Sequence, residues 1–223
     1  MMLEVVLTKD NSPTIYNREM NAFYHSVFGA IQESEYVFIK NGLEYVKDKF
    51  DTIHILEIGF GSGMNCFLTY QKCVEDGLDK KINYIGIEKF PLDVQLVEKL
   101  SEFQPFCRDV ETFMLIHAVD ITVDLHKNFF VRKMWMDIQD ALKEIENNSI
   151  HLIYYDAFAP SSQPEMWKKE IFEILFEKIV NGAVLVTFCA KGQFKRDLKE
   201  IGFEVQSLKG ALGKREMTRA IKV

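Results

Sequence analysis

The sequence predicts an α/β fold, in which helices cover both faces of a mostly parallel sheet. Short apolar runs alternate with amphipathic segments from residue 53 onward, as strands and crossover helices do in such folds. A glycine-rich stretch, GFGSG, follows the first of these runs, and a single acid follows each of two later ones. Sheets of this kind bind ligands at the carboxyl ends of their strands, so these positions are the first candidates for a site.

The first part of the sheet is predicted from two apolar runs and the segments that follow them. Residues 54–58 form a nearly continuous apolar run, typical of a strand buried on both faces, and a helix is predicted over 64–75. A second strand is predicted over 83–87. Pro91 suits the first turn of the next helix, because its missing N–H is not needed there.

The second part repeats this alternation and ends in antiparallel strands. The elements predicted here are a helix near 109–117, an extended pair near 120–126 and 129–136, a helix near 139–146, a strand over 150–155, a helix over 165–180, a strand over 182–189, a helix over 193–201 and terminal strands over 204–208 and 218–223. The predicted fold is therefore doubly wound, with a C-terminal antiparallel strand.

The first 50 residues are predicted to form a β-rich extension packed on a core domain of residues 51–223. Segments 3–8 and 36–39 contain β-branched and aromatic residues and are expected to be extended. The polar and aromatic stretch between them is expected to be an irregular cap. No repeat or Pro/Gly/Ser-rich linker separates the two parts, so one globular unit is expected.

Composition points to the cytoplasm and to a protein without a metal. No apolar run approaches the ~20 residues of a membrane span, and the N-terminus lacks the pattern of a secretory signal. We therefore expect a cytoplasmic protein without a membrane partner. The 4 cysteines form no CxxC pair and the 5 histidines show no metal-binding spacing, so buried reduced thiols and no metal are expected.

The glycine-rich stretch and a later acid predict a nucleotide-like ligand. Gly59, Gly61 and Gly63 allow a sharp turn and a close approach of the backbone to a ligand. Glu88 follows the next predicted strand, where a carboxylate can accept hydrogen bonds from both ribose hydroxyls of an adenosine group. Glycines bend many loops and acids at strand ends are often only solvated, so the prediction depends on the two features together.

NAD and S-adenosyl-L-methionine both suit this arrangement, and two features favour S-adenosyl-L-methionine. The third glycine comes two residues after the second, so the loop is not GxGxxG and no pyrophosphate site is evident. Glu57 completes an E/DxGxGxG pattern, which resembles that of class I S-adenosyl-L-methionine-dependent methyltransferases with their Rossmann-like fold, and we predict that Glu57 contacts the cofactor. Asp140 is a further candidate contact to the adenine, with a simple helix cap as the alternative.

The stretch YYDAFAPSSQPEMW places an acid at the end of a buried strand, as in enzymes that methylate amines. An ammonium has no lone pair, so it must lose a proton before it attacks a methyl group. Asp156 can orient the amine and assist that loss. Phe158 can shield the amine from water, and Pro160 completes the motif. These three residues are the predicted catalytic group.

Five motifs resemble, in order, the methyltransferase domain of the bacterial tRNA 5-methylaminomethyl-2-thiouridine biosynthesis enzyme: EIGFGSG, IEKFPL, YYDAFAPSSQPEMW, FCAKGQFKRDL and GALGKREM. The N-terminal segment YHSVFGAIQESEYVFIKNGL is also similar, so the resemblance covers nearly the whole chain. It implies methyl transfer from S-adenosyl-L-methionine to the amine of 5-aminomethyl(-2-thio)uridine at the wobble position of tRNA. It also implies that the three loop glycines, Glu88 and Asp140 contact the cofactor, and that Asp156, Phe158 and Pro160 form the amine pocket.

A tRNA partner gives a role to the basic end of an otherwise acidic chain. The net charge is −6, which argues against nucleic-acid binding by bulk electrostatics, but residues 191–223 hold 9 Lys or Arg against 4 acids. Predicted phosphate contacts, with an ordinary solvated surface as the alternative, are Lys191, Lys195, Arg196, Lys214, Arg215 and Arg219; Lys214 to Glu216 match the family's KRE. Tyr155, Trp167 and Phe194 are candidates for stacking on an unstacked anticodon base, with core packing as the open alternative, whereas Phe188 is expected in the core.

The family's bifunctional enzyme also carries an FAD-dependent oxidoreductase domain, which removes a carboxymethyl group before methylation. The 223 residues contain no counterpart of it, so we expect no FAD and a separate enzyme that supplies the aminomethyl substrate. One alternative is a methyl- or aminopropyl-transferase that acts on a small-molecule amine, because aminopropyl transferases resemble this fold and also use an Asp at a strand end. Another is a tRNA-binding module with a relic cofactor pocket.

Overall fold

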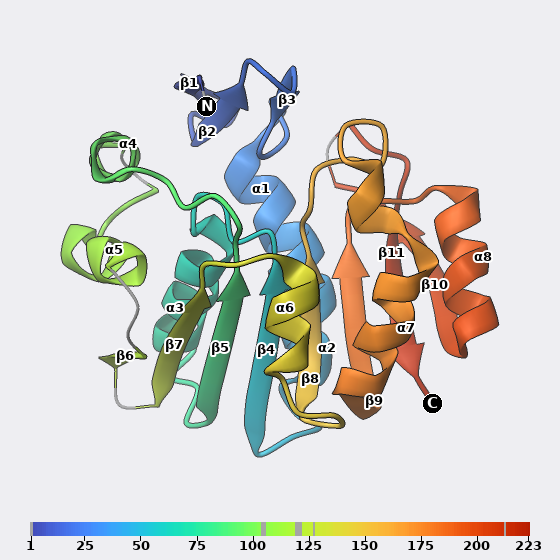
Figure 1. Cartoon of the computed structure of the whole chain (residues 1–223). Helices are drawn as coiled ribbons and strands as arrows, with labels where there is room; N and C mark the ends of the chain where they lie inside the picture. The colour runs from blue at the N-terminus through green and yellow to red at the C-terminus, as the bar shows by residue number, and fades with distance from the viewer. Residues whose placement is uncertain (1, 104–105, 119–121, 127, 212) are drawn as a thin grey trace.

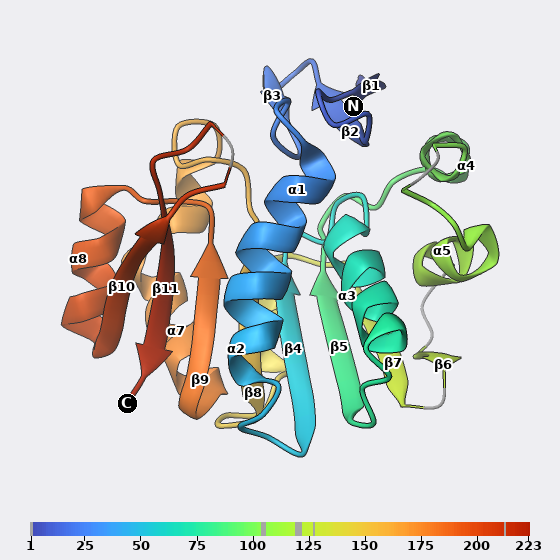
Figure 2. The ribbon, with the colours of Figure 1, turned by 180° about the vertical axis from the view of Figure 1, so that it is seen from behind.

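A central sheet with helices on both faces forms the body of the molecule (Figures 1 and 2), which confirms the predicted α/β fold. The computed structural model describes residues 2–103, 106–118, 122–126, 128–211 and 213–223. The strands of this 8-stranded sheet lie in the order β10 (Phe203–Lys209), β11 (Glu216–Lys222), β9 (Ile179–Thr187), β8 (Ile150–Tyr155), β4 (Thr52–Ile58), β5 (Lys81–Ile87), β7 (Phe129–Met134) and β6 (Val123–His126).

Strand directions match a doubly wound sheet with an antiparallel end. β4 pairs in parallel with β5 and β8, β5 with β7, and β8 with β9. β11 lies antiparallel between β9 and β10, as the predicted C-terminal hairpin requires. The chain moves from β4 toward β7 in one direction and later from β8 toward β9 in the other, so the switch point lies between β4 and β8.

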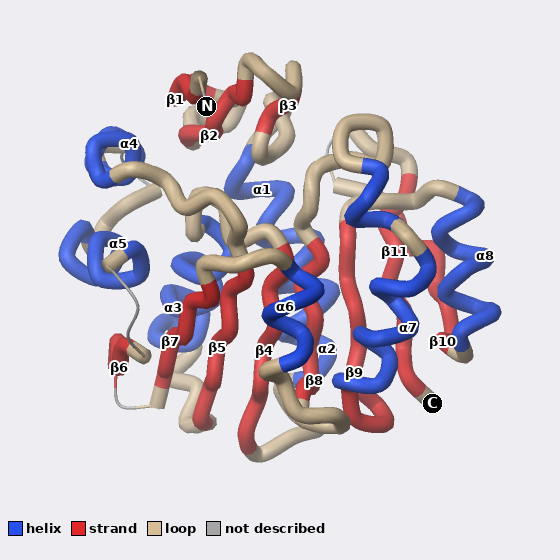
Figure 3. The backbone as a smooth tube through the Cα atoms, in the orientation of Figure 1, coloured by secondary structure: helices blue, strands red, loops and turns tan. Residues whose placement is uncertain are grey.

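Helices form one layer on each face of the sheet, as the colours of Figure 3 make clear. The first layer contains α6 (Ile138–Lys143), α7 (Lys169–Lys178) and α8 (Gly192–Ile201). The opposite layer contains α3 (Met64–Glu75) and a continuous helical segment made of α1 (Ala30–Ser34), the π-helical η1 (Glu35–Leu43) and α2 (Glu44–Val46). At the β6 end of the sheet lie α4 (Val94–Ser101) and α5 (Val110–His117).

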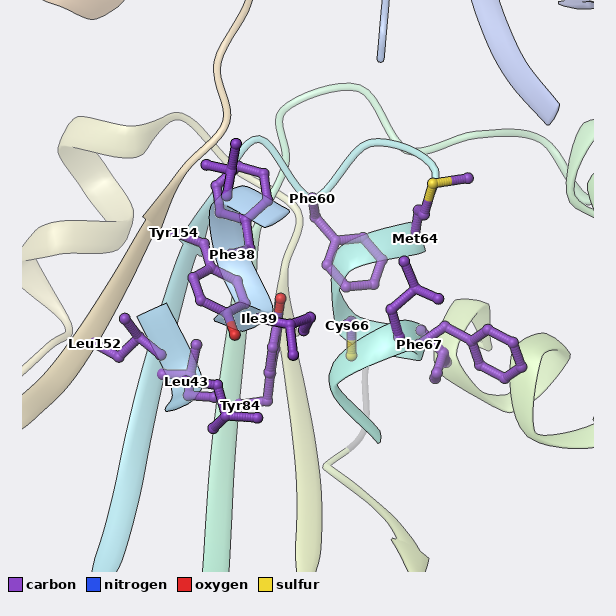
Figure 4. Packing of buried hydrophobic residues seen from close by; sticks show 14 of the residues in the cluster. Phe38, Ile39, Leu43, Phe60, Met64, Cys66, Phe67, Tyr84, Leu152 and Tyr154 are labelled. Carbon is purple, nitrogen blue, oxygen red and sulfur yellow. The ribbon is translucent and has the colours of Figure 1, made fainter. Parts of the chain in front are cut away.

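Each central strand contributes to two apolar cores, because successive side chains point to opposite faces. In β8, Leu152 and Tyr154 belong to the core under α1, η1 and α3, whereas Ile153 and Tyr155 belong to the core under α6, α7 and α8. Figure 4 shows the first core, where the rings of Phe38 and Tyr154 lie 5.1 Å apart. Burial on both faces fixes the register of the strands and therefore the positions of the residues at their carboxyl ends.

A separate three-stranded antiparallel sheet lies over the carboxyl edge of the large one (Figure 1). Its strands are β1 (Leu3–Leu7), β2 (Pro13–Asn17) and β3 (Ala22–Phe23). We call residues 2–29 the cap. The helical segment that follows the cap packs against β8, β9 and α3, so it is part of the helical layer of the main body.

Some predicted elements differ from the structure. Residues 36–39, predicted to be extended, lie in η1, because a short buried apolar run looks alike in a strand and in a buried helix. The predicted helix 165–180 is divided into the 3₁₀ turn η2 (Pro164–Trp167) and α7. α4 starts at Val94 and not at Pro91, because the Asp93 side chain accepts from the backbone N–H of Leu96 at 2.8 Å.

Two predicted segments extend outside the described residues. The strand predicted over 120–126 begins among them and is seen as β6 from Val123, and the motif GALGKREM includes one of them, residue 212. Within the described ranges, no helix combines the length and apolarity needed to cross a bilayer.

Candidate active site

A cavity of about 540 Å³ opens at the carboxyl ends of β4, β5, β7 and β8. Its walls come from the loop that follows each of these strands and from the cap. The lining residues used below are Gly59, Gly61 and Ser62 after β4, Glu88, Lys89 and Phe90 after β5, Asp137 after β7, Asp156 and Phe158 after β8, and Tyr24 and His25 from the cap. A cavity of this size suits a small organic cofactor together with part of a substrate.

The glycine loop after β4 can be built only with glycine. Gly59 and Gly61 have φ values of 86° and 51°, in the left-handed region that side chains disfavour. A Cβ atom on Gly59 would stand 2.7 Å from the backbone oxygen of Asp156, and one on Gly61 would stand 3.2 Å from the Tyr24 ring. The loop therefore lies directly against the end of β8 and against the cap. Gly63 begins α3 at φ 69° and packs on His117, outside the cavity lining.

Glu88 lies beside the glycine loop, as predicted. Its carboxylate accepts hydrogen bonds from the backbone N–H groups of Gly61, at 3.1 Å, and Phe90, at 2.9 Å. Burial raises the pKa of Glu88 above its ordinary value, and the backbone hydrogen bonds oppose that shift. Each carboxylate oxygen can accept a further hydrogen bond, so Glu88 remains able to bind ribose hydroxyls.

Asp156 lies at the end of β8, buried at the mouth of the glycine loop. The Asn65 amide nitrogen donates to its Oδ2 at 2.8 Å. Burial raises the pKa of Asp156 to about 7, and the nearby Glu33 carboxylate adds to that effect. A carboxyl group with such a pKa can accept a proton near neutral pH, which is what a general base must do.

Glu57 lies behind this carboxyl group and does not line the cavity. It is fully buried, and burial raises its pKa well above the ordinary value. It accepts hydrogen bonds from Asn65 and from the Tyr84 hydroxyl, each at 2.8 Å. Glu57 is therefore absent from the cavity lining, and its contact with the cofactor stays a prediction.

Among the lining residues that the cap supplies are Tyr24 and His25, to which the sequence analysis assigns no role. The Tyr24 ring packs edge-on against Phe158, with ring centroids 5.1 Å apart. His25 is buried, and its Nε2 lies 3.8 Å from Oδ2 of Asp156. Burial lowers the pKa of His25 to about 4, so its ring is neutral at neutral pH. The cap carries no periodic signal for either residue, but both open the segment YHSVFGAIQESEYVFIKNGL, whose similarity to the family was the signal that could have found them.

The acid on the β7 side of the cavity is Asp137, and the prediction for Asp140 is wrong. Asp140 is exposed, pairs with Lys143 at 2.7 Å and is absent from the cavity lining. Asp137 caps α6 by accepting from the Gln139 N–H at 3.0 Å, and it pairs with Lys89 at 3.1 Å. Asp137 comes three residues after β7. An acid that closely follows a predicted strand is a candidate for the carboxyl edge of the sheet, and this pattern could have predicted Asp137.

The aromatic side chains predicted to stack on a base are buried in the core under α7. Tyr155 is 0% exposed and Trp167 is 8% exposed, which contradicts their predicted role, and Phe194 is buried beside them. Trp167 has a supporting role instead, because its ring N–H donates to the backbone oxygen of Phe158 at 2.7 Å. Pro160 is half-buried and lies outside the cavity lining.

The basic C-terminal residues divide into paired and exposed ones. Lys214 forms an ion pair with the buried Glu33 and lies 3.9 Å from the centroid of the half-buried Phe188 ring, which contradicts its prediction as a phosphate contact. Lys195 pairs with Glu216 at 2.6 Å. The Arg219 guanidinium binds Gln206 and stacks over Tyr45, and Arg196 binds Gln193. Lys191, Arg196 and Arg215 are exposed, and a phosphate contact stays a prediction for them and for the paired Lys195 and Arg219.

The cavity residues fit S-adenosyl-L-methionine. The glycine loop brings backbone without side chains to the wall of the cavity, and Glu88 is placed for ribose hydroxyls. The Ser62 hydroxyl in the same loop is buried and has no hydrogen-bond partner within the described part of the chain, so this loop contains an unsatisfied polar atom. Searching the described residues finds no group of three or more His, Cys, Asp or Glu that could hold a metal ion. All four cysteines are buried, as expected.

Sequence comparison agrees with this site. Residues 102–223, which include Asp156, match a profile described as S-adenosyl-L-methionine-dependent methyltransferase. The chain belongs to this family.

This methyltransferase is also similar to individual proteins. It is 32% identical to the tRNA 5-methylaminomethyl-2-thiouridine biosynthesis bifunctional protein MnmC of Pseudoalteromonas atlantica, over 98% of this chain and 33% of that protein. The solved structure of MNMC2 from Aquifex aeolicus matches with a TM-score of 0.82 and 26% identity, over 99% of this chain and 70% of the other. Spermidine synthase from Thermotoga maritima, with a TM-score of 0.51 and 10% identity over 99% of this chain and 79% of that one, shares the fold alone. The chain spans about a third of the length of the curated relatives it matches.

Proposed function

We propose that this methyltransferase transfers a methyl group from S-adenosyl-L-methionine to the primary amine of 5-aminomethyl(-2-thio)uridine at the wobble position of tRNA. The observation that carries the proposal is the buried Asp156, placed where the glycine loop meets the end of β8. The name of the curated relatives, tRNA 5-methylaminomethyl-2-thiouridine biosynthesis bifunctional protein, supports tRNA as the source of the amine.

Four lining residues would hold the cofactor. The backbone of Gly59 and Gly61 would lie against it, Glu88 would bind its ribose, and Asp137 would approach its adenine from the β7 side. When bound, S-adenosyl-L-methionine supplies an electrophilic methyl group, and the amine gains that methyl and loses a proton while the cofactor departs as S-adenosyl-L-homocysteine.

The protein's own residues prepare the amine. Asp156 accepts a hydrogen bond from the entering ammonium and then takes its proton, which exposes the nitrogen lone pair. A pKa of about 7 makes Asp156 a stronger base than an exposed carboxylate. Phe158 and Tyr24, packed edge to face, exclude water from one side of the amine. Because the groups are held in place before the amine arrives, positioning contributes much of the rate.

The proposal includes partners outside the cavity. The exposed Lys191 and Arg215 would contact phosphates of the anticodon loop, which predicts a modest and salt-sensitive affinity. The proposed substrate carries an aminomethyl group, so a reaction that installs or exposes this amine on the tRNA must come before the methylation. Both steps would take place where tRNA is modified, in the cytoplasm.

Nucleoside analysis tests the substrate. The protein is incubated with labelled S-adenosyl-L-methionine and with tRNA that carries 5-aminomethyluridine, and the digested nucleosides are identified by mass spectrometry. We expect labelled 5-methylaminomethyluridine, and no label in a control tRNA with an unmodified wobble uridine. An absence of label from a protein that binds the cofactor by calorimetry would reject the tRNA assignment, and turnover of polyamines alone would establish the small-amine alternative.

A further inference from the structure

A chain of buried hydrogen bonds connects the start of the glycine motif to the proposed catalytic acid. The Tyr84 hydroxyl donates to Oε2 of Glu57 at 2.8 Å. The Asn65 amide nitrogen donates to Oε1 of Glu57 and to Oδ2 of Asp156, both at 2.8 Å. Tyr84 and Glu57 are 0% exposed and Asn65 is 2% exposed, so the chain is closed to solvent. It joins β5, β4, α3 and β8 just below the cavity.

The orientation of the Asn65 amide follows from its neighbours. An amide nitrogen has two N–H groups, and here each faces one carboxyl group. The opposite orientation would place an amide oxygen against two further acceptors, which is repulsive. Within the described structure Oδ1 of Asn65 is buried without a hydrogen-bond partner, so nothing opposes the orientation set by the two donors. Glu57 and Asp156 together fix this side chain.

This arrangement gives the two oxygens of Asp156 different roles. Oδ2 accepts from Asn65 and is faced by Nε2 of His25 at 3.8 Å, so it is the oxygen that the protein holds. We propose that Asn65, anchored by Glu57, is a positioning residue that holds Asp156 by Oδ2, leaves Oδ1 for the amine and favours the ionised form of the base. This inference rests on the proposed function of Asp156 as the amine base.

The direction of the effect follows from the groups around Asp156. The Asn65 hydrogen bond lowers the pKa of Asp156, and so does the Lys214 ammonium, whereas burial and the Glu33 carboxylate raise it. The buried Glu57 carboxyl and the neutral His25 ring are the other titratable groups in contact with this site. Removal of the Asn65 donor should therefore raise the pKa of Asp156 further and leave the carboxyl protonated to a higher pH.

Kinetics of Asn65→Leu test the inference. At pH 7 we expect kcat/KM for the tRNA amine to fall by roughly 10- to 100-fold. Part of the loss should be recovered at pH 9, because the midpoint of the pH profile moves upward, while the affinity for S-adenosyl-L-methionine stays within about twofold. A purely structural defect would lower activity equally at every pH, and an unchanged midpoint in a folded variant would overturn the proposal.

Two substitutions of Glu57 provide a matched control. Glu57→Gln keeps an amide oxygen that accepts from Asn65, so its pH profile should stay close to that of the wild type. Glu57→Leu removes the acceptor and should move the profile in the same direction as Asn65→Leu. If Glu57→Gln is as impaired as Glu57→Leu, the carboxylate of Glu57 acts in another way and the anchoring role is wrong.

A measurement without substrate separates this inference from the proposed function. Carboxyl carbons are labelled with ¹³C, and Asp156 is titrated by NMR in the cofactor-bound wild type and in Asn65→Leu. An upward shift of the Asp156 midpoint by about one pH unit supports the inference even if the wild type methylates no tRNA, and that second result would reject only the tRNA substrate. The same midpoint in both proteins overturns the inference even if tRNA is methylated.

Discussion

The buried position of Asp156 suits its proposed role as a base, but it lowers the free energy of unfolding at neutral pH. Its pKa in the folded protein is about 7, above the ordinary value of 3.8. The folded protein therefore keeps a proton that the unfolded chain releases between about pH 4 and pH 7. By linkage, the stability contributed by this group is fully present below pH 3.8 and is lost as the pH rises through 7.

Because the ionisation of Asp156 costs stability as the pH rises, we predict that Asp156→Asn stabilises the protein at high pH. An asparagine resembles the protonated acid in shape and charge, so at pH 8 we expect the free energy of unfolding to rise by ~1–3 kcal/mol relative to the wild type. At pH 5 the gain should be less than half as large, because only the first part of the pH range between the two pKa values, 3.8 and about 7, has been crossed. Denaturant unfolding at both pH values measures the difference. An equal gain at pH 5 and pH 8 would show that Asp156 is not a buried acid with a raised pKa.

Single site residues could be predicted where they follow a predicted strand. Gly59, Gly61, Glu88 and Asp156 directly follow predicted strands, where sequence alone points to a ligand. Asn65 could not be predicted, because its role depends on a carboxyl group 91 residues away. The prediction for Tyr155 is wrong. Tyr154 and Tyr155 point to opposite faces of the strand, and because helices cover both faces of the sheet, both side chains are buried.

At the scale of elements, the glycine loop is the part of the site least tolerant of change. Gly59 and Gly77 both have positive φ, at 86° and 58°, but only Gly59 has no space for a Cβ atom, since Gly77 has no atom within 4 Å. We expect Gly77→Ala to cost ~1 kcal/mol of stability and Gly59→Ala ~2 kcal/mol or more. Calorimetry should show at least tenfold weaker binding of S-adenosyl-L-methionine only for Gly59→Ala. Equal affinity of the two variants would contradict the assignment of the loop.

The ion pair between Glu33 in α1 and Lys214 in the turn before β11 ties two distant elements together behind Asp156. Lys214→Met leaves Glu33 buried without its partner, which should destabilise the fold by ~2 kcal/mol after allowance for the partial exposure of Lys214. It should also raise the pKa of Asp156 and move the activity profile to higher pH, whereas Glu33→Gln should move it to lower pH. The exposed Arg215→Met is the control, and shifts of the same sign in both test variants would exclude this coupling.

Helices and strands could be predicted where the apolar residues of a segment follow a single helical or strand spacing. The helix over 64–75 was predicted with its observed bounds, because it follows a glycine loop and has apolar residues at helical spacing. The η1 helix was missed because its apolar residues form a continuous run that packs against β8, β9 and α3. The short helix α6 was predicted near 139–146. It is capped by Asp137 and starts at Ile138, so the acid that lines the cavity is Asp137 and not Asp140.

At the scale of the whole molecule, a doubly wound sheet brings four strand ends to one edge and the cap covers that edge (Figure 1). The sheet was predictable because strands and helices alternate along the chain. The position of the cap was not, because the packing of a small sheet over another surface leaves no periodic signal in its sequence. The cap is nevertheless part of the site, since Tyr24 and His25 complete the walls around Asp156.

The central claim is that this assembled edge directs a methyl group to an amine held by Asp156. The most direct test measures label transfer from S-adenosyl-L-methionine to tRNA that carries 5-aminomethyluridine, with wild type and Asp156→Asn compared at equal cofactor occupancy. We expect labelled 5-methylaminomethyluridine from the wild type and about 10²-fold slower transfer by the variant, with unchanged cofactor affinity. Equal rates for the two proteins would contradict the account.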